Sequence, residues 1–477
     1  MNVLFISSEA FPFSKSGGLG DVCGSLPAAI KKFGADVRVI IPKFACIQEE
    51  LLRGNKFLTT ITMSLSWRKI QFSLEETQYE GIHYYFIDNP YYFGKERIYG
   101  YSDDAECFSF FSKAVLEALP FLGYRPDILH CHDWHTALVP LFLKENYREV
   151  MYYQGIKTIL TVHNLGYQGI APVSYFEDVL GFAGSTDAWE QLEYHGSLNF
   201  LKAGLLAADL LSTVSPTYAE EIKNPFYGEN LDEILRHRQA DLNGILNGID
   251  TEKYDPRNDP NLFINSSSSI FWKTENKLDL QNILGLSHNS EVLLVSMVSR
   301  LVNQKGIDLL ACVLEEMVSL NLQMVILGTG EKRYEDMFSY YAFRYPEKLK
   351  AILTFDNTLA SKIYGASDLL LMPSLFEPCG LSQMIAMRYG TLPVVRETGG
   401  LRDSVLPFNE FTGEGNGFSF ANYNAHELLF TVQKATKLFY EEKNVWKKLV
   451  DNAFRSDFSW DNSAEKYVLL YESCLIN

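Results

Sequence analysis

Short apolar runs alternate with amphipathic stretches along almost the whole chain, which indicates strands separated by helices. In the first half we predict strands at Val3–Ser7, Val37–Ile41, His83–Ile87, Ile128–Cys131, Thr158–Val162 and Leu210–Val214, with helices at Phe108–Leu122 and Phe200–Ala207. In the second half we predict strands at Val292–Val298, Gln323–Leu327, Ile352–Phe355, Leu369–Met372 and Leu392–Val395. Strands that are apolar throughout are buried on both faces, so the pattern predicts an α/β fold with parallel sheets between layers of helices.

A single sheet containing all these strands would be unusually large, so we expect two doubly wound α/β domains. The boundary is expected within 241–260, where an Asn-Gly turn is followed by two Asp-Pro turns. We place the first domain at residues 1–245 and the second at 246–457. The segment Trp446–Leu475 has a helical pattern interrupted at 457–459. We expect the last helix, 458–477, to cross back and complete the first domain.

Composition restricts the partners. The 42 Lys and Arg against 59 Asp and Glu give a net charge of −17 in 477 residues, of which 47% are hydrophobic. Such an acidic globular chain is not expected to bind nucleic acid or an anionic membrane, whose phosphates need a basic surface. No segment has 18 continuous apolar residues, no basic region precedes the first apolar run, and the seven cysteines form no Cys-x-x-Cys pair. We therefore expect a cytoplasmic protein without a membrane span, zinc ribbon or redox motif; nothing specifies an oligomeric state.

A glycine-rich loop containing Lys15, Gly17 and Gly18 follows the first predicted strand and leads into a helix. Glycines allow close backbone approach, and free N–H groups at a helix start attract anions, so the loop suits a phosphate or a sugar phosphate. A dinucleotide-binding oxidoreductase would need Gly-x-Gly-x-x-Gly directly after the strand and an acidic residue closing the second strand, and both are missing. The remaining alternative is a loop that needs glycine only for a tight turn.

Two further strands end in polar clusters. His130, His132 and His135 lie along one strand end, but a strand running into a turn does not easily bring three imidazoles to one ion, so we expect no metal. Ligands of doubly wound sheets bind beyond the carboxyl ends of strands, which leaves Asp133 and Trp134 as candidates for hydroxyl and ring contacts. The next strand is followed by His163-Asn164 and Tyr167-Gln168, and this density of hydroxyl-binding groups favours a sugar site over a single core histidine.

The candidate cations of the second half, Arg300 and Lys305, lie in one loop after the strand predicted at 292–298. A guanidinium fork and an ammonium can together neutralise a diphosphate without a metal ion, and no Asp-x-Asp motif is present to hold one. Glu377 follows the strand predicted at Leu369–Met372, and the pair Gly399-Gly400 follows the one at Leu392–Val395. Each loop alone could be a capped turn, but their occurrence at successive strand ends favours a ligand site.

Aromatic residues make up 14% of the chain and crowd between Tyr84 and Tyr101. Their faces could stack on the sugar rings of a long acceptor. We favour the simpler interpretation that most of them pack in the core.

These segments together resemble the bacterial glycogen synthase and plant starch synthase family. The resemblance covers nearly the whole chain, in order and at matching separations. It rests on Lys15–Leu19, His132–His135, Thr161–Gly169, Asn199–Gly204, Val214–Tyr218, Asn247-Gly248, Ser299–Gly306, Phe376–Leu381 and Thr398–Leu401. It implies a retaining GT-B glucosyltransferase with two Rossmann-like domains facing a deep interdomain cleft. Such an enzyme would move glucose from ADP-glucose to the 4-hydroxyl at the non-reducing end of an α-1,4-glucan such as glycogen, releasing ADP without a metal or other cofactor.

The resemblance also assigns roles to matching residues. The catalytic residues implied are Lys15, His163, Arg300, Lys305 and Glu377. The nucleotide sugar would contact Lys15, Gly17, Gly18, Arg300, Lys305, Phe355, Gly380, Leu381 and Ser382. The glucose or the acceptor would contact Asp133, His163, Asn164, Asn247, Glu377 and Cys379.

Two positions depart from the family pattern. Phe355 stands where such enzymes often carry a tyrosine near adenine, and Ile385 stands where many retaining GT-B enzymes have a second glutamate. Because no certain nucleophile is apparent, we favour front-face attack, with the acceptor proton passing to the departing phosphate. The rival hypothesis is a glucan-binding protein that has lost catalysis, and the intact Lys15, Arg300 and Lys305 argue against it.

Overall fold

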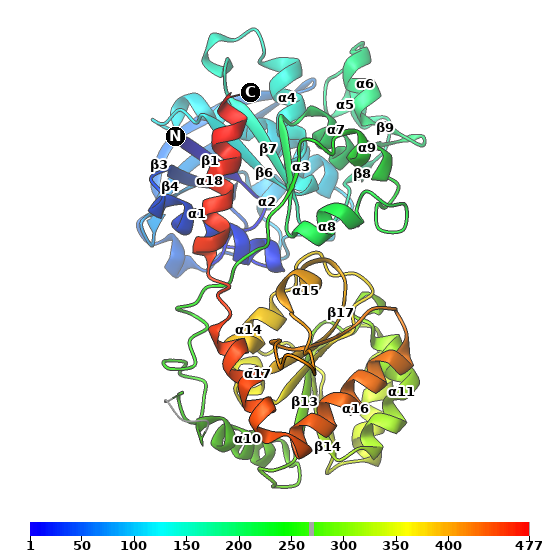
Figure 1. Ribbon diagram of the computed structural model, residues 1–477. Helices are drawn as coiled ribbons and strands as arrows, with labels where there is room; N and C mark the ends of the chain where they lie inside the picture. The colour runs from blue at the N-terminus through cyan, green and yellow to red at the C-terminus, as the bar shows by residue number, and fades with distance from the viewer. Residues whose placement is uncertain (267–270, 477) are drawn as a thin grey trace. The chain divides into compact units, whose positions relative to one another are not determined.

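The computed structural model describes residues 1–266 and 271–476, and the chain divides into two compact units (Figure 1). Unit 1 comprises Met1–Gly248 and Trp460–Asn477, and unit 2 comprises Ile249–Ser459. Each unit is built on its own largely parallel sheet, as the apolar runs predicted. None of the described helices is long and apolar enough to cross a membrane.

The main sheet of unit 1 has nine strands in the order β12-β11-β7-β6-β1-β2-β5-β4-β3. Its strands are β1 (Asn2–Ile6), β2 (Asp36–Pro42), β3 (Lys56–Leu65), β4 (Arg68–Tyr79), β5 (Ile82–Asp88), β6 (Ile128–His132), β7 (Lys157–Val162), β11 (Leu210–Thr213) and β12 (Leu242–Gly244). All neighbours pair in parallel except β3-β4 and β4-β5. The sequence pattern missed β3, at the edge of the sheet, and its neighbour β4, because both strands are only partly buried and lack a continuous apolar run.

Helices surround this sheet. They are α1 (Gly18–Lys32), α2 (Pro90–Phe93), α3 (Asp104–Ala118), α4 (Leu138–Asn146), α5 (Tyr175–Asp178), α6 (Thr186–Leu192), α7 (Phe200–Ala207), α8 (Pro216–Glu221), α9 (Asp232–His237) and α18 (Trp460–Ile476). A small antiparallel sheet adds β8 (Ile170–Ala171), β9 (Glu193–Tyr194) and β10 (Ser197–Asn199). The helix predicted at Phe108–Leu122 was misplaced at both ends: it starts at Asp104, and its last turn, Leu119–Phe121, is a 3₁₀ helix.

The C-terminal helix α18 packs against α1 in unit 1 (Figure 1). Its Tyr471 hydroxyl lies 2.8 Å from Nδ1 of His130 on β6, and both side chains are buried. The break before this helix lies at 456–459, between α17 (Lys443–Arg455) and α18, in agreement with the interruption predicted at 457–459.

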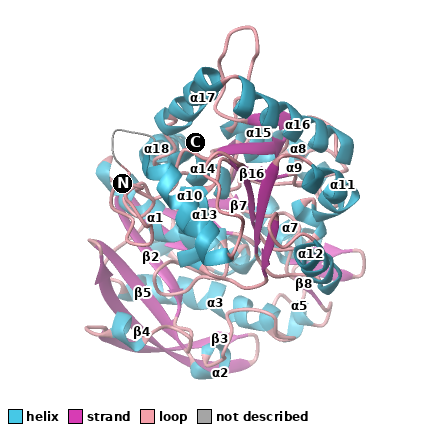
Figure 2. Ribbon diagram, turned by 90° about the horizontal axis from the view of Figure 1, so that it is seen from below, coloured by secondary structure: helices cyan, strands magenta, loops and turns pink. Residues whose placement is uncertain are grey.

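Unit 2 has a six-stranded parallel sheet in the order β15-β14-β13-β16-β17-β18. The strands are β13 (Leu293–Val298), β14 (Leu322–Leu327), β15 (Leu349–Ile352), β16 (Leu369–Met372), β17 (Leu392–Arg396) and β18 (Phe418–Phe420). The helices are α10 (Phe271–Leu284), α11 (Ile307–Ser319), α12 (Lys332–Arg344), α13 (Asn357–Ala366), α14 (Ser382–Arg388), α15 (Gly399–Ser404), α16 (Ala425–Glu441) and α17 (Figures 1 and 2). The strand predicted at Ile352–Phe355 is wrong: the strand ends at Ile352, and Phe355 lies in the loop before α13 with 80% of its surface exposed.

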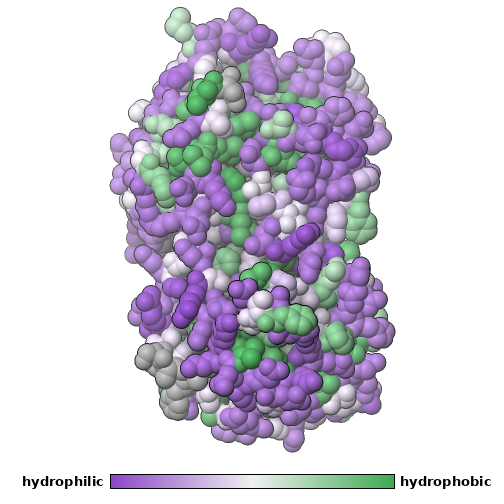
Figure 3. Space-filling model, in the orientation of Figure 1, coloured by the Kyte–Doolittle hydropathy of each residue, from purple (hydrophilic) through white to green (hydrophobic). Residues whose placement is uncertain are grey.

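Apolar packing joins α10 and α13 to the sheet of unit 2. Leu280 of α10 and Ile363 of α13 lie in one buried cluster with Leu294, Val325 and Leu327 of the strands. The outer surface is different: the face in Figure 3 is mostly hydrophilic, with apolar residues in separate patches. The apolar runs of the sequence therefore correspond to buried strands and not to the surface.

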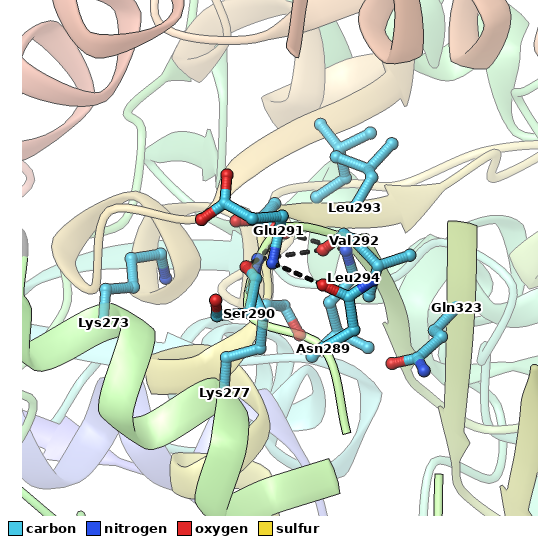
Figure 4. Close-up of polar contacts among 12 residues, drawn as sticks. Lys273, Lys277, Asn289, Ser290, Glu291, Val292, Leu293, Leu294 and Gln323 are labelled. Carbon is cyan, nitrogen blue, oxygen red and sulfur yellow. Dashed lines mark hydrogen bonds and ion pairs between the residues drawn. The ribbon is translucent and has the colours of Figure 1, made fainter. Parts of the chain in front are cut away.

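A buried lysine fixes α10 to the beginning of β13 (Figure 4). The Lys277 ammonium donates to the Val292 carbonyl at 3.0 Å and lies 2.6 Å from the Asp368 carboxylate. The same carboxylate accepts the Leu294 amide at 2.7 Å. Because a buried charge is tolerated only when it is paired and hydrogen-bonded, this arrangement satisfies both ions while holding three elements together.

Each parallel sheet reverses its strand order at one point, and this reversal positions the candidate site. In unit 1 the chain proceeds outward in opposite directions from the neighbours β1 and β6, and in unit 2 from the neighbours β13 and β16. At such a switch point the loops after the two strands diverge and leave a crevice at the carboxyl edge of the sheet. The loops that follow these four strands carry most of the residues that the sequence singled out.

Candidate active site

The loop after β1 is organised by a residue that the sequence analysis did not select, Glu9. Its carboxylate accepts hydrogen bonds from the backbone N–H and the hydroxyl of Ser16, from the Gly17 N–H at 3.2 Å and from the Tyr99 hydroxyl at 2.7 Å. Glu9 is 2% exposed. The Gly17 amide, which we expected to be free for a phosphate, is therefore already bonded in this structure.

The Lys15 ammonium is also not free in this structure. Its ammonium lies 2.7 Å from the carboxylate of Asp21 in the first turn of α1, and both side chains are about a quarter to a third exposed. Gly17 and Gly18 border open space, since a methyl group added to either would meet no atom within 4 Å. The loop thus presents a loosely paired cation and an unobstructed stretch of backbone to the carboxyl edge of the sheet.

The loops after β6 and β7 meet through Asp133. Its carboxylate accepts the backbone N–H of His163 at 2.7 Å and that of Asn164 at 3.4 Å, and its own N–H donates to the Thr161 carbonyl. Asp133 has a positive φ of 57° and is almost fully buried. Burial raises its pKa to about 7, although the two N–H bonds act in the opposite direction. Asp133 therefore orients the His163-Asn164 turn, a role different from the direct sugar contact that we expected.

His163 is half-buried and contacts a cluster of buried imidazoles. Its Nε2 lies 3.0 Å from Nδ1 of His132, and the rings of His130 and His132 are 4.2 Å apart. Burial lowers the pKa of His130, His135 and His163 to about 3 and that of His132 well below its usual value. All four are therefore neutral at pH 7, which suits hydrogen bonding to an uncharged hydroxyl.

The aromatic crowd between Tyr84 and Tyr101 is mostly core, as favoured from the sequence. Tyr84, Tyr85, Phe86, Tyr92 and Phe93 are buried, whereas Tyr91 is exposed. Tyr99 is different, because it lies in the site: its ring stacks on His135 at 4.6 Å while its hydroxyl reaches Glu9.

Asn247 lies in unit 1, three residues after β12, and is 5% exposed. Its side-chain oxygen is buried and has no hydrogen-bond partner among the described residues. An unsatisfied buried acceptor is costly, so this oxygen is available to a ligand donor.

The switch point of unit 2 is bridged by an ion pair. Lys305, in the loop after β13, places its Nζ 2.6 Å from Oε2 of Glu377, in the loop after β16, and the Ser374 hydroxyl donates to the same oxygen at 3.0 Å. The side chain of Lys305 is 17% exposed and that of Glu377 is 8% exposed. Two residues assigned to the diphosphate and to the glucosyl ring are thus in direct contact, and Lys305 is not a free cation in this state.

Arg300 is exposed and weakly held. Among the described residues, its guanidinium makes one hydrogen bond, to the Gln304 side-chain oxygen at 3.3 Å. Gln304 also joins the two loops of the switch point, because its backbone carbonyl accepts the Leu375 N–H at 2.9 Å. Arg300 is therefore the cation of this loop that is free to move toward an anion.

The Gly399-Gly400 pair has a packing role. The Gly400 N–H donates to the Glu377 carbonyl at 3.1 Å, and a methyl group at Gly400 would lie 2.2 Å from the Cys379 carbonyl oxygen. The pair lets β17 and α15 approach the Glu377 loop closely. It supports this loop from behind, whereas the sequence had suggested a ligand contact.

The rest of the 376–382 segment lies next to Glu377. Cys379 is buried, while Gly380, Leu381 and Ser382 are partly exposed at the start of α14. The sequence analysis missed two buried residues that hold this segment. Gln383 donates to the Cys379 and Gly380 carbonyls at 3.1 and 2.9 Å, and Arg396 donates to the Ser374 and Leu375 carbonyls. Both are polar residues close in sequence to a glycine turn, and this pattern is the sequence signal that could have pointed to them.

No group of three His, Cys, Asp or Glu side chains in the part of the chain that the structure describes is arranged to hold a metal ion. The histidines at 130, 132 and 135 accordingly form hydrogen bonds and ring contacts with protein groups.

Comparison with known proteins identifies the family of this chain. Residues 2–237 match the starch synthase catalytic domain model, and residues 282–452 match the model of glycosyl transferases group 1. Glycogen synthase of Desulforamulus reducens is 50% identical over 482 aligned residues, covering 100% of this chain and 99% of the relative. Glycogen synthase of Clostridium acetobutylicum is 50% identical over 477 residues, covering all of both chains.

The chain belongs to the glycogen synthase family. The catalytic domain of starch synthase IV from Arabidopsis thaliana, bound to ADP and acarbose, superposes with a TM-score of 0.92 at 34% identity, covering 100% of this chain and 99% of that one. Sucrose-phosphate synthase from Thermosynechococcus elongatus shares the fold, with a TM-score of 0.61 at 16% identity. The GT-B fold expected from the sequence is therefore confirmed.

Membership in the glycogen synthase family makes this protein an enzyme, a glucosyltransferase of glycogen synthesis. The rival hypothesis of a glucan-binding protein without catalysis is set aside. The individual residue roles, the cytoplasmic location and the independence from a metal stay predictions.

Proposed function

We propose that this synthase transfers glucose from ADP-glucose to the 4-hydroxyl at the non-reducing end of an α-1,4-glucan, with retention of the anomeric configuration and release of ADP. The observation that carries the proposal is the Lys305–Glu377 pair at the switch point of unit 2. It joins the residue expected to neutralise the diphosphate to the residue expected to hold the glucosyl ring. The similarity to a starch synthase bound to ADP and acarbose supports the nucleotide and the glucan as ligands.

The chemistry follows from where charge develops. Cleavage of the bond between the anomeric carbon and the phosphate leaves negative charge on the departing ADP, and Arg300 and Lys305 are the cations placed to stabilise it. A preorganised donor contributes about 3–4 kcal/mol to the transition state, and Lys305 is the donor held in place here. In the resting state Glu377 keeps Lys305 in place at 2.6 Å, so little reorganisation is needed when the diphosphate arrives.

Retention is assigned to attack from the front face. A double displacement needs a carboxylate positioned as nucleophile on the opposite face of the sugar. Glu377 already accepts from Lys305 and Ser374, and Ile385 stands at the other family position for a glutamate. The acceptor hydroxyl would instead pass its proton to the departing phosphate oxygen as the new bond forms on the same face.

The neutral imidazole of His163 and the buried oxygen of Asn247 are the groups that we assign to sugar hydroxyls. Asp133 supports this assignment by fixing the backbone of the His163 turn. The ring of Phe355, exposed beyond β15, is assigned to the adenine face, where it can stack without offering a hydroxyl.

The test is a nucleotide-release assay with glycogen as acceptor and ADP-glucose or UDP-glucose as donor. We expect ADP release with a clear preference for ADP-glucose, and a product in which NMR shows the new linkage as α. Release only from UDP-glucose would refute the donor assignment, and a β linkage would refute retention. A glucosyl–enzyme adduct trapped by mass spectrometry would refute front-face attack.

A further inference from the structure

The carboxylate of Glu9 accepts four hydrogen bonds at the carboxyl edge of unit 1, and none of the catalytic or ligand-binding roles assigned above uses it. It accepts from two consecutive backbone amides and one hydroxyl of the Lys15 loop, at Ser16 and Gly17, and from the Tyr99 hydroxyl. Tyr99 in turn contacts the Ser8 hydroxyl at 2.6 Å and stacks on His135. Glu9 thus connects the glycine loop to the wall of the site formed after β6.

The bonded amides lie at the N-terminus of α1, where a phosphate would be expected to bind. The unpaired amides of a helix start and its dipole favour an anion at this position. Glu9 supplies that anion from within the protein at the Ser16 and Gly17 amides. A ligand phosphate therefore does not need these amides, and what the loop offers to a ligand is the Lys15 ammonium and the open backbone at Gly18.

Packing couples Glu9 to Lys15 directly. A methyl group added to Gly20 would lie 3.0 Å from Cγ of Lys15 and 3.1 Å from Oε2 of Glu9. The stem of Lys15 and the carboxylate of Glu9 therefore lie side by side against the first turn of α1. A shift of the carboxylate displaces the backbone immediately after Lys15 and the surface on which its side chain rests.

We infer that Glu9 is a positioning residue: by occupying the Ser16 and Gly17 amides, it sets the Lys15 loop in the geometry that receives the sugar nucleotide. The inference rests on the proposed function only for the identity of that ligand. Replacing the carboxylate by an amide removes the negative charge and leaves a single acceptor oxygen, so the two amides and two hydroxyls that donate to Glu9 can no longer all donate to it. The loop then loses its defined position while the fold of unit 1 remains.

The experiment compares Glu9→Gln with the matched control Glu117→Gln. Glu117 on α3 also accepts a tyrosine hydroxyl, from Tyr147 at 2.7 Å, but lies outside the candidate site. We expect Glu9→Gln to lower kcat/KM for ADP-glucose by about 10- to 100-fold, as for an interaction realised in the transition state, and Glu117→Gln to change it by less than about twofold. A value for Glu9→Gln within twofold of the wild type overturns the inference.

A double-mutant cycle separates positioning from a general structural effect. If Glu9 acts through Lys15, then Glu9→Gln combined with Lys15→Ala should be at most about twofold less active than Lys15→Ala alone, because coupled residues are not additive. If the two losses multiply, Glu9 acts independently of Lys15 and the inference is wrong.

A measurement without catalysis keeps the inference distinct from the proposed function. Amide hydrogen exchange of the peptide containing residues 14–20 should be faster in Glu9→Gln than in the wild type, with exchange of β1 and β6 unchanged. If the wild type fails to use ADP-glucose while this local increase is seen, the proposed donor is wrong and the loop assignment holds. Unchanged exchange of the loop refutes the assignment whatever the donor.

Discussion

Nζ of Lys305 lies 2.6 Å from Oε2 of Glu377, which makes one ion pair out of two residues whose expected ligands are different parts of the same donor. The pair spans the switch point between β13 and β16. Both side chains are largely shielded from solvent, with Lys305 17% and Glu377 8% exposed. In the resting protein Glu377 therefore neutralises the positive charge of Lys305, which the diphosphate would neutralise during the reaction.

Lys305 and Arg300 are expected to differ in their effect on stability while having a similar effect on rate. Either change to alanine should lower kcat by about 10²–10³-fold, because each removes a cation that we assign to the charge developing on the leaving group. Lys305→Ala also leaves Glu377 with the Ser374 hydroxyl as its remaining side-chain partner, which costs about 3 kcal/mol when a buried pair is broken. Arg300 is exposed, so its removal should leave unfolding unchanged.

Steady-state kinetics and thermal unfolding of the two variants test this difference. Lys305→Arg is the matched control that keeps the charge. Near-normal rates in both alanine variants would refute the diphosphate assignment, and an equal loss of stability in both would refute the buried role of the Lys305–Glu377 pair.

The reaction should not require a divalent metal ion. We expect Arg300 and Lys305 to neutralise the diphosphate in place of a metal ion, so activity measured after dialysis against EDTA should remain within about twofold of the untreated enzyme, because no Lewis acid is being removed. Loss of activity in EDTA that is restored by added Mg²⁺ would show that the cations do not suffice.

Gly400→Ala should displace the Glu377 loop without changing any residue assigned to the ligand. The added methyl group would lie 2.2 Å from the Cys379 carbonyl oxygen, in backbone that cannot move without moving the loop. We expect a loss of stability of about 1–3 kcal/mol, typical of overpacking, together with a rise in KM for the donor. Thermal unfolding and donor KM measure the two effects, and a variant with normal values for both would contradict the supporting role of the Gly399-Gly400 pair.

Stability should fall as the pH drops below about 6.5. Burial lowers the pKa of His130, His132, His135 and His163. The unfolded chain binds protons on these four groups below its ordinary pKa of about 6.5, whereas the folded protein does not, so stability present above that pH is lost on acidification. Asp133, with its pKa raised to about 7, changes stability in the opposite direction, but the effect of the four histidines is larger than that of one carboxyl group.

Urea unfolding at intervals between pH 7.5 and 4.5 measures this dependence. Each unmatched proton changes the free energy of unfolding by up to about 1.4 kcal/mol per pH unit. Replacing the buried His135 by asparagine should flatten the dependence. A free energy of unfolding that stays constant from pH 7.5 to 5 would show that the cluster does not titrate as described.

Continuous apolar runs predicted the central strands well, because a strand buried on both faces must be apolar throughout. The helix Phe200–Ala207 and the strand Leu369–Met372 have the predicted bounds. The strands β3 and β4 were not predicted, because many of their side chains are exposed or half-buried and so are not apolar throughout. The strand at Ile352 was extended too far because Phe355 is apolar but exposed.

The sequence by itself determined which loops matter, since Lys15, His163, Arg300, Lys305 and Glu377 all follow apolar runs at strand ends. Only the tertiary structure decided their partners. Lys15 is paired with Asp21 and Lys305 with Glu377, and Glu9 takes the Gly17 amide, one of the two amides expected to hold a phosphate. The reason is physical: strand ends are read from local apolar periodicity. The partners of Lys15 and Glu9 depend on how the loop after β1 folds back on itself, and the partner of Lys305 depends on β13 and β16 becoming neighbours.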